Sequence, residues 1–147
     1  MNLNVVNETN KLKKVVLGIA NNLGEVPLPS DCIDPKTKHY LINGEYPLEN
    51  NCIAEIENFN NILIDNGVTV IRPKPITDLN QIFTRDIAFV IDNIIFEANT
   101  IDARAEEKNG ILDILNNEIG SNIKIPKGIK IEGGDVIINN NFIFIGY

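Results

Sequence analysis

Short apolar runs separated by polar turns divide the chain into blocks that predict alternating strands and helices. The run KVVLGIA (14–20) is typical of a buried strand, because it is short and ends at a polar Asn-Asn turn. Residues 21–47 contain several prolines and no clear period, so we interpret them as a long loop.

A helical period begins at Leu48. Apolar residues are spaced by four, three and four positions, which places Cys52, Ile56, Phe59 and Leu63 on one helical face. Asn66-Gly67 is expected to end this helix, because these residue types commonly follow a helix C-terminus. The run VTVIRP (68–73) predicts the next strand.

A second block reads as strand, turn, strand, helix and strand. DIAFVID (86–92) and IIFEA (94–98) predict two strands joined at Asp92-Asn93, and IKIP (123–126) predicts a third. Between them Asp102 is expected to cap a helix. This helix has apolar positions every four residues and is expected to stop at Gly120, the apolar residues being Ile111, Leu115 and Ile119.

A third block, DVIINNNFIFIGY (135–147), resembles the hairpin of the second. In both, an aspartate precedes an apolar strand, and a polar turn leads to another apolar strand; the two starts lie 49 positions apart. This spacing is in the range of repeated supersecondary units. The sequence ends at this strand, before a helix and strand that would complete the unit. We therefore expect an exposed strand edge and self-association through it.

Length and composition fit a folded globular protein of one-domain size. The 147 residues are 44% hydrophobic and 22% charged, which is ordinary for a globular chain. The net charge of −7 disfavours binding to nucleic acid, because both carry negative charge, and it favours cationic small molecules as ligands.

No feature of the sequence predicts a membrane span, a metal site or a secretory signal. The N-terminus is polar, and no apolar run approaches the roughly 20 residues of a membrane helix. Cys32 and Cys52 lack metal-ligand spacing, and His39 is the single histidine. We expect a cytoplasmic protein with no cofactor.

Two polar clusters at the starts of apolar strands contain the candidate functional residues. In FTRDIAFVIDN (83–93), Asp86 opens the strand; in IEGGDVIINN (131–140), Glu132 and Asp135 flank a glycine pair. Paired glycines allow a sharp bend and the close approach of a ligand or neighbouring segment. Spacing alone leaves two readings open, because carboxylates and Gly-Gly pairs are also common at ordinary turns.

These motifs resemble the guanidine-modifying superfamily of amidinotransferases, arginine deiminases and dimethylarginine hydrolases. FTRD and EGGD, each before an apolar hairpin, carry the resemblance, which VTVIRPKPI (68–76), RDIAFVIDNIIFEA (85–98) and DARAEE (102–107) extend. The resemblance implies a five-bladed α/β propeller (pentein) of strand-strand-helix-strand units. Residues 1–147 would then be its N-terminal portion, truncated in the third unit.

The resemblance also implies roles for three residues in binding a guanidino substrate. Asp86 would hold the substrate guanidinium, and Glu132, the candidate catalytic carboxylate, would grip it from another side. Carboxylates match the fixed N–H fork of a guanidinium. Arg104 would reach the substrate carboxylate, although pairing with Glu107 is its alternative. Two neighbours complete the binding candidates: Arg85, for which a surface ion pair is the alternative, and Asp135.

The superfamily attacks the guanidinium carbon with a late cysteine, assisted by a histidine that follows EGGD. Neither residue type follows Glu132 in this chain. We therefore expect the chain alone to be inactive, and the sequence leaves open whether it is a natural truncation. The upstream similarity favours a transferase, whereas EGGD is more similar to the hydrolases. A non-catalytic ligand-binding or partner-binding member is the alternative function.

Overall fold

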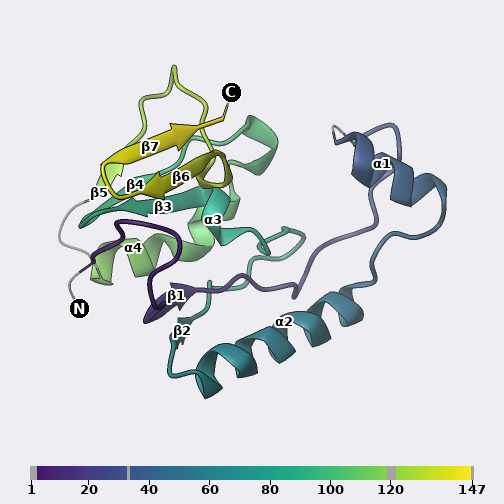
Figure 1. Ribbon diagram of the computed structural model, residues 1–147. Helices are drawn as coiled ribbons and strands as arrows, with labels where there is room; N and C mark the ends of the chain where they lie inside the picture. The colour runs from purple at the N-terminus through teal and green to yellow at the C-terminus, as the bar shows by residue number, and fades with distance from the viewer. Residues whose placement is uncertain (1–2, 33, 119–121, 147) are drawn as a thin grey trace.

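The computed structural model describes residues 3–32, 34–118 and 122–146. Its architecture is mixed α/β with three small sheets (Figure 1). The strands are β1 (Lys14–Val16), β2 (Thr69–Ile71), β3 (Ala88–Ile91), β4 (Ile94–Glu97), β5 (Asn122–Lys124), β6 (Val136–Asn139) and β7 (Phe142–Ile145). The α-helices are α1 (Pro35–Ile42), α2 (Glu49–Asp65), α3 (Thr84–Ile87) and α4 (Leu112–Glu118). The 3-10 helices are η1 (Asp102–Arg104), η2 (Glu107–Ile111) and η3 (Gly133–Asp135).

The central layer is the three-stranded sheet β3-β4-β5, which confirms the strand-strand-helix-strand order of the second block. β3 and β4 are antiparallel, and β5 returns parallel to β4 after α4. Asp92 adopts a positive φ of 54° at the predicted turn between β3 and β4. The other two sheets are the parallel pair β1-β2 and the antiparallel hairpin β6-β7.

Figure 1 shows α4 and β6 on opposite sides of the central sheet. Two clusters of buried apolar side chains hold them there. On one face, Ile87 and Ile95 pack against the helical segment, which contributes Ile111 and Leu115. The other face packs on β6 through a second buried set, formed by Phe89, Ala98, Val136 and Ile138. Because successive side chains of a strand point to opposite faces, the central sheet packs against the helical segment on one face and against β6 on the other.

Several predicted element boundaries are wrong for identifiable reasons. The predicted loop 21–47 contains α1, which begins where the Asp34 carboxylate accepts from the Thr37 amide, with Pro35 in the first turn. Proline at the first helical position fits a helix, because its missing N–H needs no partner there. The strand predicted from Asp86 begins two residues later, since Asp86 lies in the helical turn α3.

Further differences concern the predicted helices. Phe59, predicted to share one apolar face of α2 with three other residues, is 51% exposed. Gly67 follows the helix with φ 76°, as expected. Asp102 lies inside η1 and binds Lys130 instead of capping a helix. Ile111 and Leu115 are buried as predicted; Ile119 and Gly120 lie outside the described residues.

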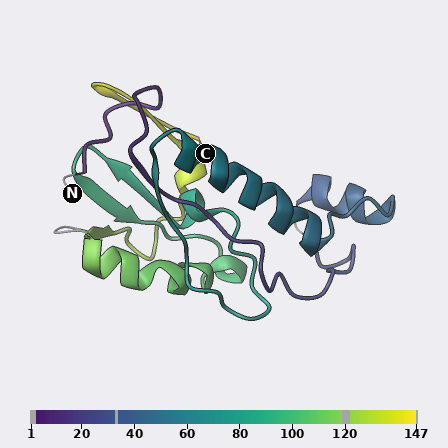
Figure 2. The ribbon, with the colours of Figure 1, turned by 90° about the horizontal axis from the view of Figure 1, so that it is seen from below.

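The periphery is less tightly packed than the central layer. Figures 1 and 2 both place α1 beyond the end of α2, away from the three-stranded sheet. No residue of α1 or α2 is fully buried. Every residue of β7 is exposed. Among the described residues, no helix has both the length and the apolar character to cross a bilayer.

Candidate functional site

The two sequence motifs meet at the helical turns α3 and η3, which contact each other. A Cβ atom built on Gly133 would lie 2.0 Å from the Arg85 carbonyl oxygen, and one on Gly134 would lie 2.6 Å from Asp86 Oδ1. Neither glycine has a positive φ. The glycine pair is therefore required for the close approach of the two segments, the second of the two uses expected from sequence.

Three carboxylates converge on the guanidinium of Arg104. Glu107 accepts from Nε and from Nη2, each at 2.8 Å. Nη1 donates to Asp86 Oδ2 at 3.1 Å and to Glu132 Oε2 at 2.8 Å. We call Asp86, Glu107 and Glu132 the carboxylate cluster. The structure thus brings together three of the residues named from sequence, and it also contains the Arg104–Glu107 pair given as the alternative for Arg104.

The carboxylate cluster carries more negative charge than Arg104 neutralises. Three carboxylates and one guanidinium leave two formal negative charges in a part-buried site, where the side-chain exposures are 21% for Asp86, 28% for Glu132 and 7% for Glu107. Arg104 Cζ also lies 5.9 Å from the centroid of the Phe83 ring. Such a site attracts a further cation.

The proton affinities of two groups reflect this arrangement. Hydrogen bonds to Glu107 raise the pKa of Arg104 above its usual range, with Asp86 and Glu132 contributing, so the guanidinium is permanently charged. Burial raises the pKa of Glu132, and the negative charges of Asp86, Asp135 and Glu107 add to this effect. Arg104 lowers the same pKa but is outweighed. Glu132 therefore holds a proton more readily than a free glutamate.

Arg85, named as a substrate-binding candidate, instead joins three segments of the chain. Its Nη1 and Nη2 donate to the two carboxylate oxygens of Glu8 at 3.1 and 2.9 Å. Nε donates to the Gly133 carbonyl at 3.1 Å and Nη2 to the Val136 carbonyl at 2.6 Å. These bonds connect the N-terminal segment, α3 and the start of β6, so the guanidinium is occupied by structural contacts.

Asp135 lies at the edge of the site. Its side chain is exposed, and its backbone carbonyl accepts from the Gly146 amide at 2.9 Å. Among the described contacts, none joins its carboxylate to Arg104. Its influence is electrostatic, through the pKa of Glu132.

Three residues make buried or part-buried contacts that the sequence did not predict in full. Glu107 was considered only as a partner for Arg104, yet it is a buried member of the carboxylate cluster. Thr84 Oγ1 donates to the Val16 carbonyl at 2.7 Å and fixes α3 to β1. The buried Gln81 side chain bonds the backbone of Lys74 and Ile76. The three-residue spacing of Arg104 and Glu107 was the available signal for Glu107.

The fold is similar to that of two amidinotransferases of known structure. SxtG, an amidinotransferase from Microseira wollei in the saxitoxin biosynthetic pathway, matches with a TM-score of 0.68 and 18% identity, over 95% of this chain and 53% of SxtG. The inosamine-phosphate amidinotransferase StrB1 from Streptomyces griseus matches with a TM-score of 0.67 and 19% identity, over 94% of this chain and 53% of StrB1.

A third similar structure is a cysteine-to-alanine mutant of AgrE in a binary complex with L-arginine. Its TM-score is 0.69 with 14% identity, and the match covers 94% of this chain and 20% of AgrE. No protein-family model matches the chain, and no curated protein matches its sequence. The chain thus spans about half the length of the two amidinotransferases, and the resemblance seen in its motifs is confirmed in its fold.

Proposed function

We propose that the chain is the N-terminal portion of an enzyme that acts on guanidino C–N bonds of arginine-like substrates. The observation that supports this function best is the carboxylate cluster around a guanidinium, in which Asp86 and Glu132 both reach one nitrogen. The same two carboxylates come from FTRD and EGGD. The fold shared with two amidinotransferases agrees with this assignment.

In this proposal Asp86 and Glu132 bind the substrate guanidinium, and Glu132 is the catalytic carboxylate. Their second oxygens, Oδ1 and Oε1, accept no hydrogen bond among the described contacts and are available to a ligand. Burial raises the pKa of Glu132, a property that catalytic carboxylates in enzyme sites commonly share. The excess negative charge of the carboxylate cluster stabilises the additional cation.

Arg104 orients the carboxylate cluster and retains one N–H for the substrate. Of the five N–H groups of a guanidinium, four donate to Glu107, Asp86 and Glu132. The fifth, on Nη2, is available to a substrate carboxylate, the role that the family resemblance implies. We assign Arg85 to positioning of the motif segments and Asp135 to electrostatic support.

The remaining catalytic groups belong, in this proposal, to parts of the whole protein beyond these 147 residues. Those groups are a cysteine nucleophile and a histidine acid–base, and the complete domain is a five-bladed propeller. Among the described residues, Cys52 lines a separate pocket and His39 bonds Asn43 on the exposed surface of α1. The thiolate would attack the guanidinium carbon and an amine would leave, so that the amidino group becomes bound to sulfur. Water or an acceptor amine would then take the amidino group and release the thiolate.

A non-catalytic scaffold is the second candidate, and one observation favours it. Arg104 already supplies a guanidinium to the carboxylate cluster, as a purely structural ion-pair network would require. In that case the site would bind no external ligand.

Calorimetric titration with L-arginine and L-citrulline separates the two candidates. Citrulline has nearly the same shape but a neutral end group, so the proposed site binds arginine more tightly. Asp86→Asn removes one charge of the carboxylate cluster and weakens arginine binding about tenfold or more, whereas Asp92→Asn, at an exposed turn, is the matched control. Equal affinities for both ligands, or an unchanged affinity in Asp86→Asn, would refute the guanidino site and favour the scaffold.

A further inference from the structure

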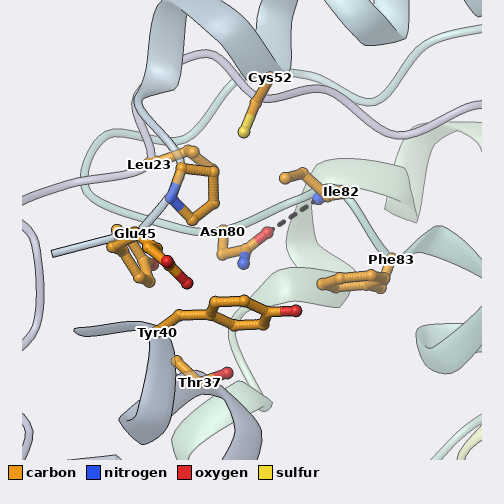
Figure 3. A pocket seen from close by; sticks show the side chains of 10 residues that line it. Leu23, Thr37, Tyr40, Glu45, Cys52, Asn80, Ile82 and Phe83 are labelled. Atoms are coloured by element: carbon orange, nitrogen blue, oxygen red, sulfur yellow. Dashed lines mark hydrogen bonds between the residues drawn. The ribbon is translucent and has the colours of Figure 1, made fainter. Parts of the chain in front are cut away.

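A cavity of about 470 Å³ lies between the start of α2, the end of α1 and the segment that leads into α3 (Figure 3). Its volume is in the range of small-molecule sites. Phe83 lines this cavity and also lies beneath the Arg104 guanidinium, so the cavity adjoins the carboxylate cluster. No member of that cluster lines it, so a ligand here is bound by different residues.

The lining combines aromatic surface with one negative charge. Tyr40, Tyr46 and Phe83 contribute rings, and Glu45 is the one formally charged side chain among the described lining residues. No lysine, arginine or histidine is in this set. Burial raises the pKa of Tyr46, an effect to which Cys32 and Cys52 add, so its phenol stays neutral and able to donate a hydrogen bond.

The polar groups of the cavity have capacity for a ligand. Figure 3 shows the Glu45 carboxylate and the Asn80 amide directed toward the space beside the Tyr40 ring. Asn80 Oδ1 accepts from the Ile82 amide at 3.0 Å, which fixes the amide orientation. Among the described contacts, the Glu45 carboxylate and Asn80 Nδ2 have no protein partner. A carboxylate beside aromatic faces is the arrangement that favours an organic cation.

We propose that this cavity is a second binding site, for a small organic ammonium ion whose charge pairs with Glu45 and whose apolar body contacts Tyr40 and Phe83. Asn80 Nδ2 and the tyrosine hydroxyls would hydrogen-bond polar substituents of the same ligand. An anion is disfavoured, because the charged lining side chain is a carboxylate.

Cyclohexylammonium, cyclohexanol and cyclohexanecarboxylate are matched probes, since they share one ring and differ in charge. We expect NMR titration to perturb the amides of Tyr40, Glu45 and Asn80, with the ammonium bound most tightly and the carboxylate least. Glu45→Gln and Tyr40→Leu are each expected to weaken ammonium binding about threefold, and about tenfold together. Glu45 and Tyr40 are both exposed, so neither substitution should change the fold measured by circular dichroism.

The carboxylate cluster and the cavity are distinguished by measuring how a variant of each site binds the ligand of the other. Asp86→Asn should leave cyclohexylammonium binding unchanged, and Glu45→Gln should leave arginine preferred over citrulline. The second site is overturned if the three probes bind equally, if the perturbed amides lie elsewhere, or if the double variant Glu45→Gln, Tyr40→Leu binds the ammonium as the unmodified chain does. None of these outcomes depends on whether arginine binds the carboxylate cluster.

Discussion

Single atoms decide how closely the two motif segments approach. The Gly133 position leaves no room for a methyl group, because the Arg85 carbonyl lies 2.0 Å from where its Cβ would be. Gly134 faces the side-chain oxygen of Asp86 instead, which is able to move. The first glycine thus supports the fold, and the second supports the placement of a binding carboxylate.

Gly133→Ala is expected to lower the free energy of unfolding by about 2 kcal/mol, the cost of forcing a group into a packed backbone contact. Gly134→Ala should cost less stability and displace Asp86, which weakens arginine binding. Denaturant unfolding and arginine titration measure the two effects. Gly128→Ala is the control, because no atom lies within 4 Å of its added Cβ. Equal unfolding midpoints for Gly133→Ala and Gly128→Ala would contradict the close-contact account.

Glu132 makes the opposite kind of contribution, since its charge is unfavourable in the folded chain. The pKa of Glu132 in the folded chain lies above the unfolded value of about 4.3. The protonated side chain therefore contributes to stability below about pH 4.3, and this contribution is lost as the pH rises through the pKa of the folded state. We therefore expect Glu132→Gln to keep or raise the free energy of unfolding at neutral pH, with the difference shrinking in acid. A loss of stability at neutral pH would show that the Glu132–Arg104 pair outweighs burial.

These side chains also show what the sequence was able to predict. The resemblance of FTRD and EGGD to the guanidine-modifying superfamily implies that Asp86 and Glu132 lie close together, and both carboxylates accept from Arg104 Nη1. The partners of Arg85 were not predictable, because Glu8 is far away in sequence and is aligned by the bridges of the N-terminal segment to the hairpin turns. Glu107 was underestimated because an i,i+3 pair on a helix is usually a surface feature.

Strands with alternating buried and exposed residues were predicted better than short helices, whose position depends on the residues at their ends. β6 alternates buried and exposed residues, and the hairpin pattern was evident. α1 was missed because its apolar residues face solvent and its prolines suggested a loop; its start depends on the Asp34 cap. The start of β3 was misplaced because α3 is a single helical turn, too short to produce a period.

The unequal burial of the elements predicts unequal local stability. The β3–β4 hairpin contributes buried side chains to two apolar clusters, whereas α1 and α2 contribute no fully buried residue. Amide hydrogen exchange should therefore be slowest in β3 and β4 and at least about tenfold faster in α2. Equal protection in α2 and β4 would mean that the chain opens as one cooperative unit.

For the molecule as a whole, β7 is the surface most exposed to association. All its residues are exposed, including Phe142 at 67% and Ile145 at 57%, and β6 pairs with one of its edges only. An unpaired apolar strand of this kind readily pairs with another chain. The matched region covers 53% of each of the two amidinotransferases of similar fold.

Sedimentation velocity tests self-association through β7. The unmodified chain is expected to form concentration-dependent oligomers, and Ile143→Lys with Ile145→Lys to shift it toward monomer, because charged side chains oppose edge pairing. Ile42→Lys, at a similarly exposed apolar residue on α1, serves as the control and should leave association unchanged. A monomeric unmodified chain with a sharp, cooperative unfolding transition would contradict the prediction.

The most direct test of the guanidino site is a structure of the chain with bound L-arginine. We expect the ligand guanidinium to lie within hydrogen-bond distance of both Asp86 and Glu132, with Arg104 still bound by Glu107. A ligand located elsewhere, with Arg104 retaining its contacts to all three carboxylates, would contradict the proposed function and identify the cluster as a structural ion-pair network.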